Sequence, residues 1–462
     1  MARDVSDATP IESRDELVAW VAQGEKPSAA WRIGTEHEKV PFYRADATPV
    51  PFAGPAGIEA LLAGLQRATG WEPIEDQGNL IGLFEGEGGG AVSLEPGGQF
   101  ELSGGLMADV HETRAELDEH LTQLGRVAAP LGIGFLDLGM SPLWRREETP
   151  VMPKSRYRIM MGYMPKVGSL GLDMMLRTAT VQVNLDFSSE ADMVKKLRVS
   201  LALQPLATAL FANSPFTDGR PNGFLSMRSH IWTDTDPHRT GMMPIAFEDG
   251  FGYERYVDWL LDVPMYFVKR GATYHDVAGA SFRDLMAGRL AQLPGELPTT
   301  SDWANHVSTV FPEVRLKRFL EMRGSDTGPR SFLMAAPAFW VGLLYDRSSL
   351  DAAWDLVKHW TSEERQTFRD EAPTLGLDAV VAGRKAAEIA RETLKIARAG
   401  LTRRAIKDAL GRDETSYLDP LEQVAESGRS RARDLLDRYH GAWGESVRPA
   451  FRECVLLDPA PA

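Results

Sequence analysis

Strict alternation of polar and apolar side chains marks the stretch Thr180-Val181-Gln182-Val183-Asn184-Leu185-Asp186. Successive side chains of a β-strand point to opposite faces of the sheet. Val181, Val183 and Leu185 therefore face one way, whereas Gln182 and Asn184 face the other. The stretch predicts a strand whose apolar face packs on a core and whose polar face can bind a ligand.

Three further stretches combine the same pattern with charged side chains: Arg32 to Glu38, Ser93 to Glu101, and Arg318 to Arg323. Strand alternation places Glu36 beside Glu38, and Glu321 beside Arg323, while Glu95 and Glu101 flank Pro96-Gly97-Gly98. Carboxylate and carboxamide oxygens are hard ligands that suit Mg²⁺ and the metal-bound phosphates of ATP. An arginine beside such acids can stabilise charge on a transferring phosphoryl group. Together the four stretches predict a site of phosphoryl transfer.

Each stretch also has a plainer interpretation. The glutamate pair of the first can face solvent on an edge strand, and the Pro-Gly-Gly segment can be an ordinary hairpin corner. The Glu321 and Arg323 pair can be purely structural, and carboxamides on an exposed face are common. His37 lies on the face opposite Glu36 and is expected to be a packed, hydrogen-bonded histidine rather than a metal ligand. The basic residues Lys154, Arg156, Arg158 and Lys166 can hold nucleotide phosphates or form a solvated surface.

Bulk composition narrows the class of protein. The chain has 462 residues and a net charge of −14, which disfavours nucleic acid as the main partner. The longest apolar run, from Phe332 to Tyr345, contains Pro337 and is too short to cross a bilayer. The single cysteine, Cys454, excludes an intrachain disulfide, and the N-terminus lacks the apolar core of a signal peptide. We therefore expect a cytoplasmic protein without a membrane partner.

Strand and helix patterns mix without a regular βαβ rhythm, which predicts an α+β fold with an antiparallel sheet. The first strand is expected to end at Pro41, and a hairpin is expected from residues 79 to 95. Helices are expected over residues 14–23, 58–69, 109–130 and 189–213, and almost throughout the chain beyond Ala338. We expect two parts, a catalytic body at residues 1–345 and a mainly helical part at residues 346–462 packed on it.

At these motifs the chain resembles the glutamate–cysteine ligases, in particular the plant and proteobacterial branch. The resemblance rests on Gly34 to Glu38, Ser93 to Gly104, Met164 to Ser169, Thr180 to Phe187, Phe224 to Trp232, and Phe311 to Arg318. It implies the glutamine-synthetase-like catalytic fold, in which an antiparallel sheet curls into a funnel backed by helices. It also implies two or more Mg²⁺ ions and the substrates ATP, L-glutamate and L-cysteine, in a monomer or homodimer.

The resemblance assigns roles to individual residues. Metal ligands would be Glu36, Glu38, Glu95, Glu101 and Glu321, with Gln182 or Asn184 binding metal or substrate. Arg323 would face the phosphates and act with Glu321 in catalysis, and Lys166 would help to bind ATP. Arg228 would meet the glutamate carboxylate, and Tyr266 would line the substrate pocket. The plant members carry regulatory cysteines, whereas this chain has only Cys454.

The implied reaction joins the γ-carboxylate of L-glutamate to the amine of L-cysteine through a γ-glutamyl phosphate. It yields γ-glutamylcysteine, ADP and phosphate, in the first step of glutathione biosynthesis. Three alternatives stay open at this point: a related ligase with another amine or a product for another thiol such as ergothioneine, a nucleotide-binding regulator without turnover, and a hydrolase that uses paired carboxylates.

Overall fold

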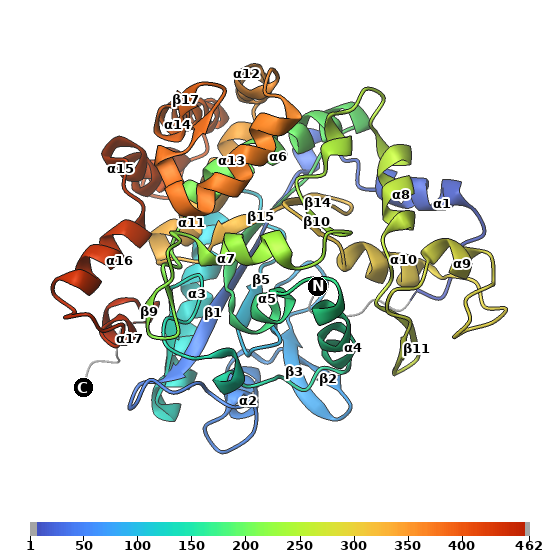
Figure 1. The fold of residues 1–462 in the computed structure, drawn as a ribbon, viewed down its shortest axis with the longest axis horizontal. Coiled ribbons are helices and arrows are strands. Elements are labelled where there is room, and N and C mark those ends of the chain that lie inside the picture. Colours follow the sequence, from blue (N-terminus) through green and yellow to red (C-terminus); the bar gives the residue numbers. More distant parts are fainter. Residues whose placement is uncertain (1–6, 458–462) are drawn as a thin grey trace.

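A nine-stranded sheet runs through the computed structural model, which describes residues 7–457 (Figure 1). All pairings within this sheet are antiparallel. The strands, in spatial order, are β14 (Val314–Leu316), β15 (Leu320–Asp326), β7 (Thr180–Leu185), β1 (Ile33–Tyr43), β5 (Phe100–Ser103), β4 (Ala91–Leu94), β3 (Asn79–Phe84) and β2 (Glu72–Asp76), with β6 (Ile133–Leu136) paired to β1 off this path. The expected α+β class is confirmed.

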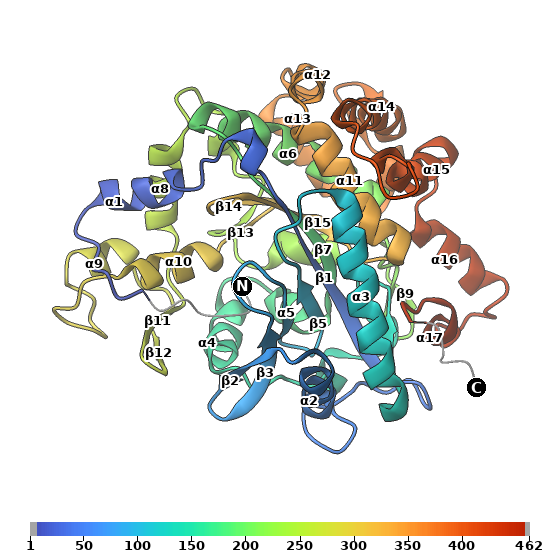
Figure 2. The same cartoon turned by 180° about the vertical axis from the view of Figure 1, so that it is seen from behind.

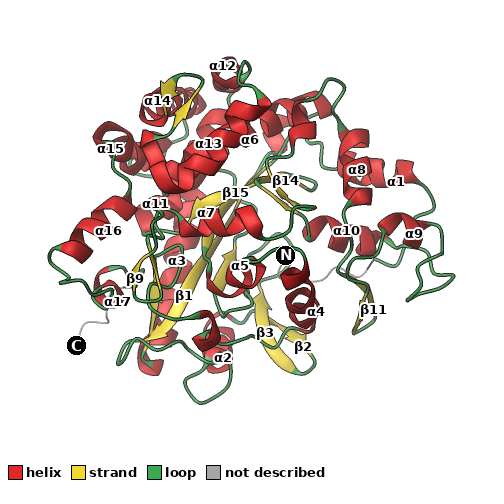
Figure 3. Ribbon diagram, in the orientation of Figure 1, coloured by secondary structure: helices red, strands yellow, loops and turns green. Residues whose placement is uncertain are grey.

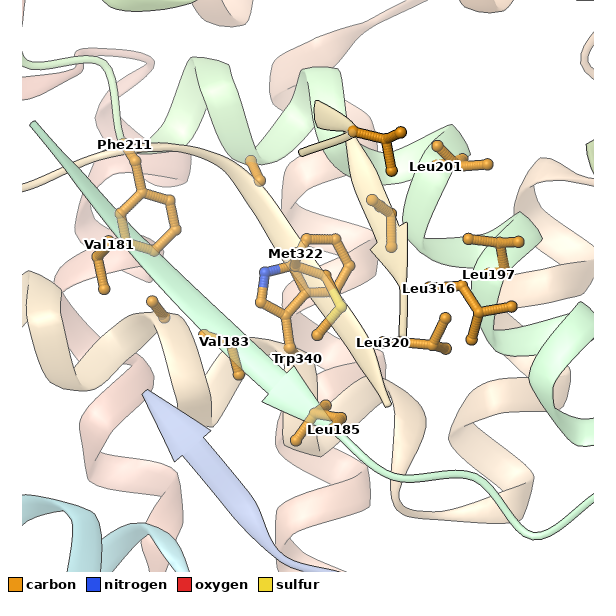
Figure 4. Close-up of a cluster of buried hydrophobic side chains, with 14 of the residues drawn as sticks. Val181, Val183, Leu185, Leu197, Leu201, Phe211, Leu316, Leu320, Met322 and Trp340 are labelled. Atoms are coloured by element: carbon orange, nitrogen blue, oxygen red, sulfur yellow. The ribbon is translucent and has the colours of Figure 1, made fainter. Parts of the chain in front are cut away.

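One face of the sheet is apolar and is covered by three helices, α3 (Val110–Ala128), α6 (Glu190–Leu210) and α11 (Arg330–Leu344). Figure 2 shows α3 and α11 lying across the sheet on this side. In Figure 4, side chains of β7, β14 and β15 gather against α6 and Trp340 of α11. Val183, Leu320 and Trp340 are almost fully buried there. Burying the apolar alternate residues fixes the register of these strands and turns their polar residues to the opposite face.

The opposite, polar face is enclosed by shorter helices: α4 (Ser155–Tyr163), α5 (Gly171–Arg177), α7 (Met227–Ile231) and α10 (Thr300–Ser308). Two of them, α5 and α7, lie in front of the sheet in Figure 1. Small two-stranded pairings complete this side: β8 (Phe216–Thr217) with β9 (Arg220–Pro221), β10 (Thr240–Gly241) with β13 (Phe311–Pro312), and β11 (Phe267–Arg270) with β12 (Thr273–Asp276). Helix α2 (Ile58–Thr69) packs against α3 and β3, and the outlying helices are α1 (Arg14–Ala22), α8 (Tyr253–Asp262) and α9 (Phe282–Met286).

From α11 onward the described chain is almost wholly helical, as expected (Figure 3). The helices are α12 (Arg347–Val357), α13 (Ser362–Leu375), α14 (Ala386–Arg404), α15 (Asp419–Ser427), α16 (Arg431–His440) and α17 (Ala450–Glu453), with one short hairpin of β16 (Val380–Val381) and β17 (Arg384–Lys385). The apolar run predicted from the sequence forms α11, which packs against α14 and β7. In the part of the chain that the structure describes, no helix has the length and apolar character needed to cross a membrane. The division at residue 345 stays a prediction.

The expected end of the first strand at Pro41 is wrong, because β1 continues to Tyr43. Residues before Val40 pair with β5 and β7, whereas Val40 to Tyr43 pair with β6. At Pro41 itself only β6 is a paired strand, so the missing N–H of proline breaks no second ladder. Pro41 therefore marks the place where β1 changes its pairing partner, not the place where the strand ends.

Candidate functional site

A cavity of about 160 Å³ opens on the polar face of the sheet. Its floor is made by residues of β1, β5 and β7 and its walls by α4, α5, α7 and α10. Of the predicted site residues, it brings together Glu36, Glu38, Glu95, Glu101, Gln182, Arg228 and Arg323. Residues from all four stretches singled out in the sequence thus meet at one place.

Strand register places the acids side by side. Glu38 lies directly opposite Glu101 on β5, and Glu36 lies opposite Gln182 on β7. Glu38 is 8% exposed, and its Oε2 accepts a hydrogen bond from the backbone N–H of Thr180 at 3.0 Å. Burial raises the pKa of Glu38 well above its ordinary value, and the nearby charges of Glu95 and Glu101 contribute to the same shift. The cavity therefore concentrates carboxylates that repel one another, as expected where cations bind.

The Pro-Gly-Gly segment forms the tight turn that brings Glu95 to the cavity. Gly98 has a φ of +86°, which favours glycine, and its N–H donates to the carbonyl of Glu95 at 2.9 Å. A Cβ on Gly97 would lie 2.0 Å from the carbonyl oxygen of Leu176, at the end of α5. The two glycines therefore let the turn between β4 and β5 pack directly against the backbone of the cavity wall.

Glu321 lies beside the cavity but not among its lining residues. It is completely buried and binds three cations: Arg315 (2.6 Å), Lys317 (2.8 Å) and Arg323. Burial alone would raise the pKa of Glu321, but these three cations hold it well below its ordinary value. In this structure, therefore, the carboxylate of Glu321 is saturated by basic side chains.

Arg323 links the basic and acidic groups of the polar face. Its Nη1 donates to Oε1 of Gln182 at 2.6 Å and pairs with Glu321, and the side chain lines the cavity. Asn184 donates from Nδ2 to Oε1 of Glu36 at 3.0 Å and does not line the cavity. The two carboxamides therefore hold Arg323 and Glu36, respectively, in fixed positions.

Arg228 reaches the cavity from the short helix α7. Ser226 caps this helix by accepting a hydrogen bond from the N–H of Ser229, and its own hydroxyl donates to buried Asp326 at 2.8 Å. Arg228 is 3% exposed and donates from Nη2 to the carbonyl of Arg323 at 2.8 Å. The helix cap and the Asp326 hydrogen bond thus fix a buried guanidinium at the cavity wall.

Two further predicted site residues, Tyr266 and Lys166, also lie away from the cavity lining. Tyr266 is 1% exposed and stacks on the guanidinium of Arg239, at 3.7 Å from the ring centre. Lys166 is exposed at the end of a short turn after α4. His37 is buried on the apolar face beside His120, as expected for a packed residue. The expectation that it is hydrogen-bonded is wrong, because both ring nitrogens are buried without a hydrogen-bond partner.

Several cavity residues were not assigned from the sequence. Arg315 lines the cavity from β14, between buried Val314 and Leu316, so the same strand alternation could have identified it. Arg156 lines the cavity from α4, within the basic stretch noted above. Trp232, Met160, Met174, Met175 and Phe311 supply apolar walls, and no periodic signal marks them as part of a site.

The residues present fit Mg²⁺ and ATP by their chemistry. Four carboxylates offer hard oxygen ligands at the cavity, and Oδ1 of Asn184 is buried without a hydrogen-bond partner. Among residues 7–457, no three acidic, histidine or cysteine side chains already converge on one point. The donor atoms are thus present, although a bound cation would have to draw them together.

Comparison with known proteins gives a family match over nearly the whole chain. Residues 32–453 match the family model described as glutamate–cysteine ligase family 2. The chain is 54% identical over 446 residues to the chloroplastic glutamate–cysteine ligase of Nicotiana tabacum, covering 96% of this chain and 83% of that protein. It is 53% identical to the chloroplastic enzyme of Arabidopsis thaliana, with the same coverage.

A solved structure supports the fold. The glutamate–cysteine ligase of Francisella tularensis in complex with AMP superposes with a TM-score of 0.53 at 11% identity, covering 90% of this chain and 86% of that one. At that identity the likeness concerns the fold alone, and it confirms the expected glutamine-synthetase-like architecture.

The prediction of a cytoplasmic location is wrong. Relatives from tobacco, mustard and Arabidopsis are all named chloroplastic, so their names contradict the expectation of a cytoplasmic protein. The prediction rested on a single cysteine and on the absence of a signal-peptide pattern. Cysteine usage reports a reducing environment but does not distinguish one reducing compartment from another.

Proposed function

The chain belongs to glutamate–cysteine ligase family 2 and is a ligase of the first step of glutathione biosynthesis, and from this premise we propose how its cavity works. We propose that ATP phosphorylates the γ-carboxylate of L-glutamate in the cavity. The amine of L-cysteine then attacks the γ-glutamyl phosphate, releasing phosphate and forming γ-glutamylcysteine.

One observation carries this proposal: acidic and basic groups occupy neighbouring parts of a single polar sheet face. Glu36, Glu38 and Glu101 stand on β1 and β5, while Arg323 stands on β15 and lines the same cavity. Phosphoryl transfer between two anions needs cations around the transferring group, and this face supplies arginine directly and carboxylates for metal ions.

Mg²⁺, when bound, would neutralise phosphate charge. We propose Glu36, Glu38, Glu95 and Glu101 as its ligands, and two or more ions as its number. Glu321 stays a predicted ligand, although its oxygens already bind three basic side chains.

The remaining roles belong to side chains that hold and orient the reactants. Gln182 holds the guanidinium of Arg323 at 2.6 Å, so that Arg323 meets developing phosphoryl charge without first reorganising. Arg228 is buried at the wall and is proposed to bind a glutamate carboxylate, because a desolvated guanidinium pairs strongly with carboxylate. The apolar walls exclude water, which would otherwise hydrolyse the acyl phosphate.

Product analysis tests the proposal. Purified enzyme with ATP, Mg²⁺, L-glutamate and L-cysteine should form γ-glutamylcysteine together with equal amounts of ADP and phosphate. Omitting either amino acid or adding EDTA should abolish ADP formation. AMP and pyrophosphate as products, or equal turnover in EDTA, would contradict the mechanism.

A panel of amines in place of cysteine separates the remaining ligase alternative. If another amine is turned over faster than cysteine, that amine is the acceptor, and the proposed phosphoryl transfer is unchanged. Product release without ATP would instead favour the hydrolase, and binding of ATP without turnover would favour the regulator.

A further inference from the structure

A small side chamber adjoins the main cavity behind Trp232 and Phe311. Its volume is about 10 Å³, and it shares Arg228 and Arg323 with the main cavity. A space of this size holds about one water-sized group. It could therefore admit a single oxygen atom of a ligand that occupies the main cavity, but not a side chain or a phosphate.

Arg369 of α13 lines this side chamber and is 4% exposed. Its Nε donates to Oε1 of Glu313 at 2.8 Å, and its Nη2 donates to the carbonyl of Ser229 at 3.2 Å. The remaining nitrogen, Nη1, is buried without a hydrogen-bond partner. A helix of the C-terminal part thus places a guanidinium, with one unused donor, at the edge of the site.

Arg228 presents the same feature from the other side. Its Nη2 is used by the carbonyl of Arg323, whereas Nε and Nη1 are buried without partners. Buried polar groups in native proteins are nearly always paired, so unused donors on two buried arginines at one chamber need an acceptor. Of the three arginines in the lining, Arg369 pairs with Glu313 and Arg323 pairs with Glu321, which leaves the positive charge of Arg228 without an ion pair among the described residues.

We propose that the side chamber is a carboxylate subsite, in which Arg228 and Arg369 together hold one oxygen of the α-carboxylate of an amino-acid substrate. The inference rests on the proposed function and extends it to Arg369, a residue outside the motifs that identified the family. A carboxylate oxygen fits the volume, accepts several N–H donors at once and neutralises the excess charge.

Kinetics of Arg369→Lys test the subsite. Lysine can still neutralise Glu313 and so preserves the fold, but it cannot bind Glu313 and Ser229 and also offer a third nitrogen. We expect the KM for one amino acid to rise about ten- to hundredfold, while kcat and the KM for ATP stay close to wild type. Arg369→Met should show the same pattern more strongly.

The matched control is Arg365→Met. Arg365 lies one turn earlier on α13 and is similarly buried, but it donates to the carbonyl of Trp360 and stacks on Phe247 at 3.5 Å. It should leave all three KM values unchanged. Unchanged KM values in both Arg369 variants, or a uniform loss matching the control, would overturn the proposal.

Two arms identify which amino acid supplies the carboxylate. Cysteamine is an acceptor amine that lacks a carboxylate. If the chamber holds the carboxylate of cysteine, Arg369→Lys should no longer raise the KM for the acceptor when cysteamine replaces cysteine. If the chamber holds the carboxylate of glutamate, the rise in the KM for glutamate should persist with cysteamine. Calorimetric titration of L-glutamate and of L-cysteine provides a readout without turnover. If wild type makes no product, the proposed function fails, and the titrations then test the subsite alone, which fails if Arg369→Lys changes neither of them.

Discussion

Glu321→Gln is expected to destabilise the protein strongly, unlike the same substitution at Glu36. Strand alternation alone treats these acids as equivalent polar residues. The structure separates them, because Glu321 is completely buried with three cations, whereas Glu36 is half-buried and accepts one hydrogen bond from Asn184. The difference should appear in stability before any substrate is added.

The magnitude follows from the ion pairs that are lost. Arg315 donates to both oxygens of Glu321, at 2.6 and 2.9 Å, and Lys317 pairs at 2.8 Å. A neutral glutamine keeps at most some of these hydrogen bonds and leaves buried cations without their counter-charge. Removing one partner of a buried pair costs about 3–5 kcal/mol, and this is the loss we expect in the free energy of unfolding.

Urea unfolding at pH 7 in EDTA measures this loss directly. Glu36→Gln serves as the control and should stay within about 1 kcal/mol of wild type, since its site is only half-buried. A Glu321→Gln variant within about 1 kcal/mol of wild type would refute the reasoning, because three buried cations would then need no carboxylate.

The pH dependence has a definite sign. The cations hold the pKa of Glu321 in the folded protein well below its ordinary value of 4.5. Its stabilisation is therefore fully present above that ordinary value and is lost as the pH falls toward the folded pKa. The difference between wild type and Glu321→Gln should accordingly be constant at neutral pH and shrink in acid.

Three other expectations follow from single contacts. Glu38→Gln should cut turnover about a thousandfold. It should also raise the free energy of unfolding at pH 8 in EDTA, because burial and two nearby carboxylates raise the pKa of Glu38, and a loss of stability would contradict this. Gly97→Ala should cost at least about 1–3 kcal/mol in urea unfolding, because its Cβ would lie 2.0 Å from a backbone oxygen, whereas Gly162→Ala, with open space around its Cβ, should not. Cys454 is fully buried and burial raises its pKa to about 12, so a thiol reagent should label it only after unfolding, and rapid labelling of native protein would refute this.

The sequence predicted the parts of this site that lie on strands. Period-two alternation fixes which face a side chain takes, so Glu36, Glu38, Glu101, Gln182 and Arg323 were all placed correctly on one polar face. Alternation cannot say whether that face is open or filled, and this is why Glu321 could not be distinguished from the acids that line the cavity. That distinction depends on Arg315 and Lys317, which the fold brings beside it.

The walls of the cavity were beyond sequence reasoning for a related cause. Met160, Met174 and Trp232 come from short helices whose apolar residues are typical of any core. Arg369 lies far in sequence from the recognised motifs, since it belongs to α13, which follows β15 in the chain and carries no motif. Such residues join the site only through tertiary packing, which local patterns do not encode.

The polar face is divided into an acidic part on β1, on β5 and directly after β4, and a basic part on β14 and β15, with Gln182 of β7 between them. Because neighbouring strands lie about 5 Å apart, a polyphosphate placed across β7 would reach both parts at once. The acids would bind it through metal ions and Arg323 would bind it directly, so neither part alone could balance its charge. The basic side chains are paired with Glu321 and not with the cavity acids, which leaves those carboxylates available for the proposed metal binding.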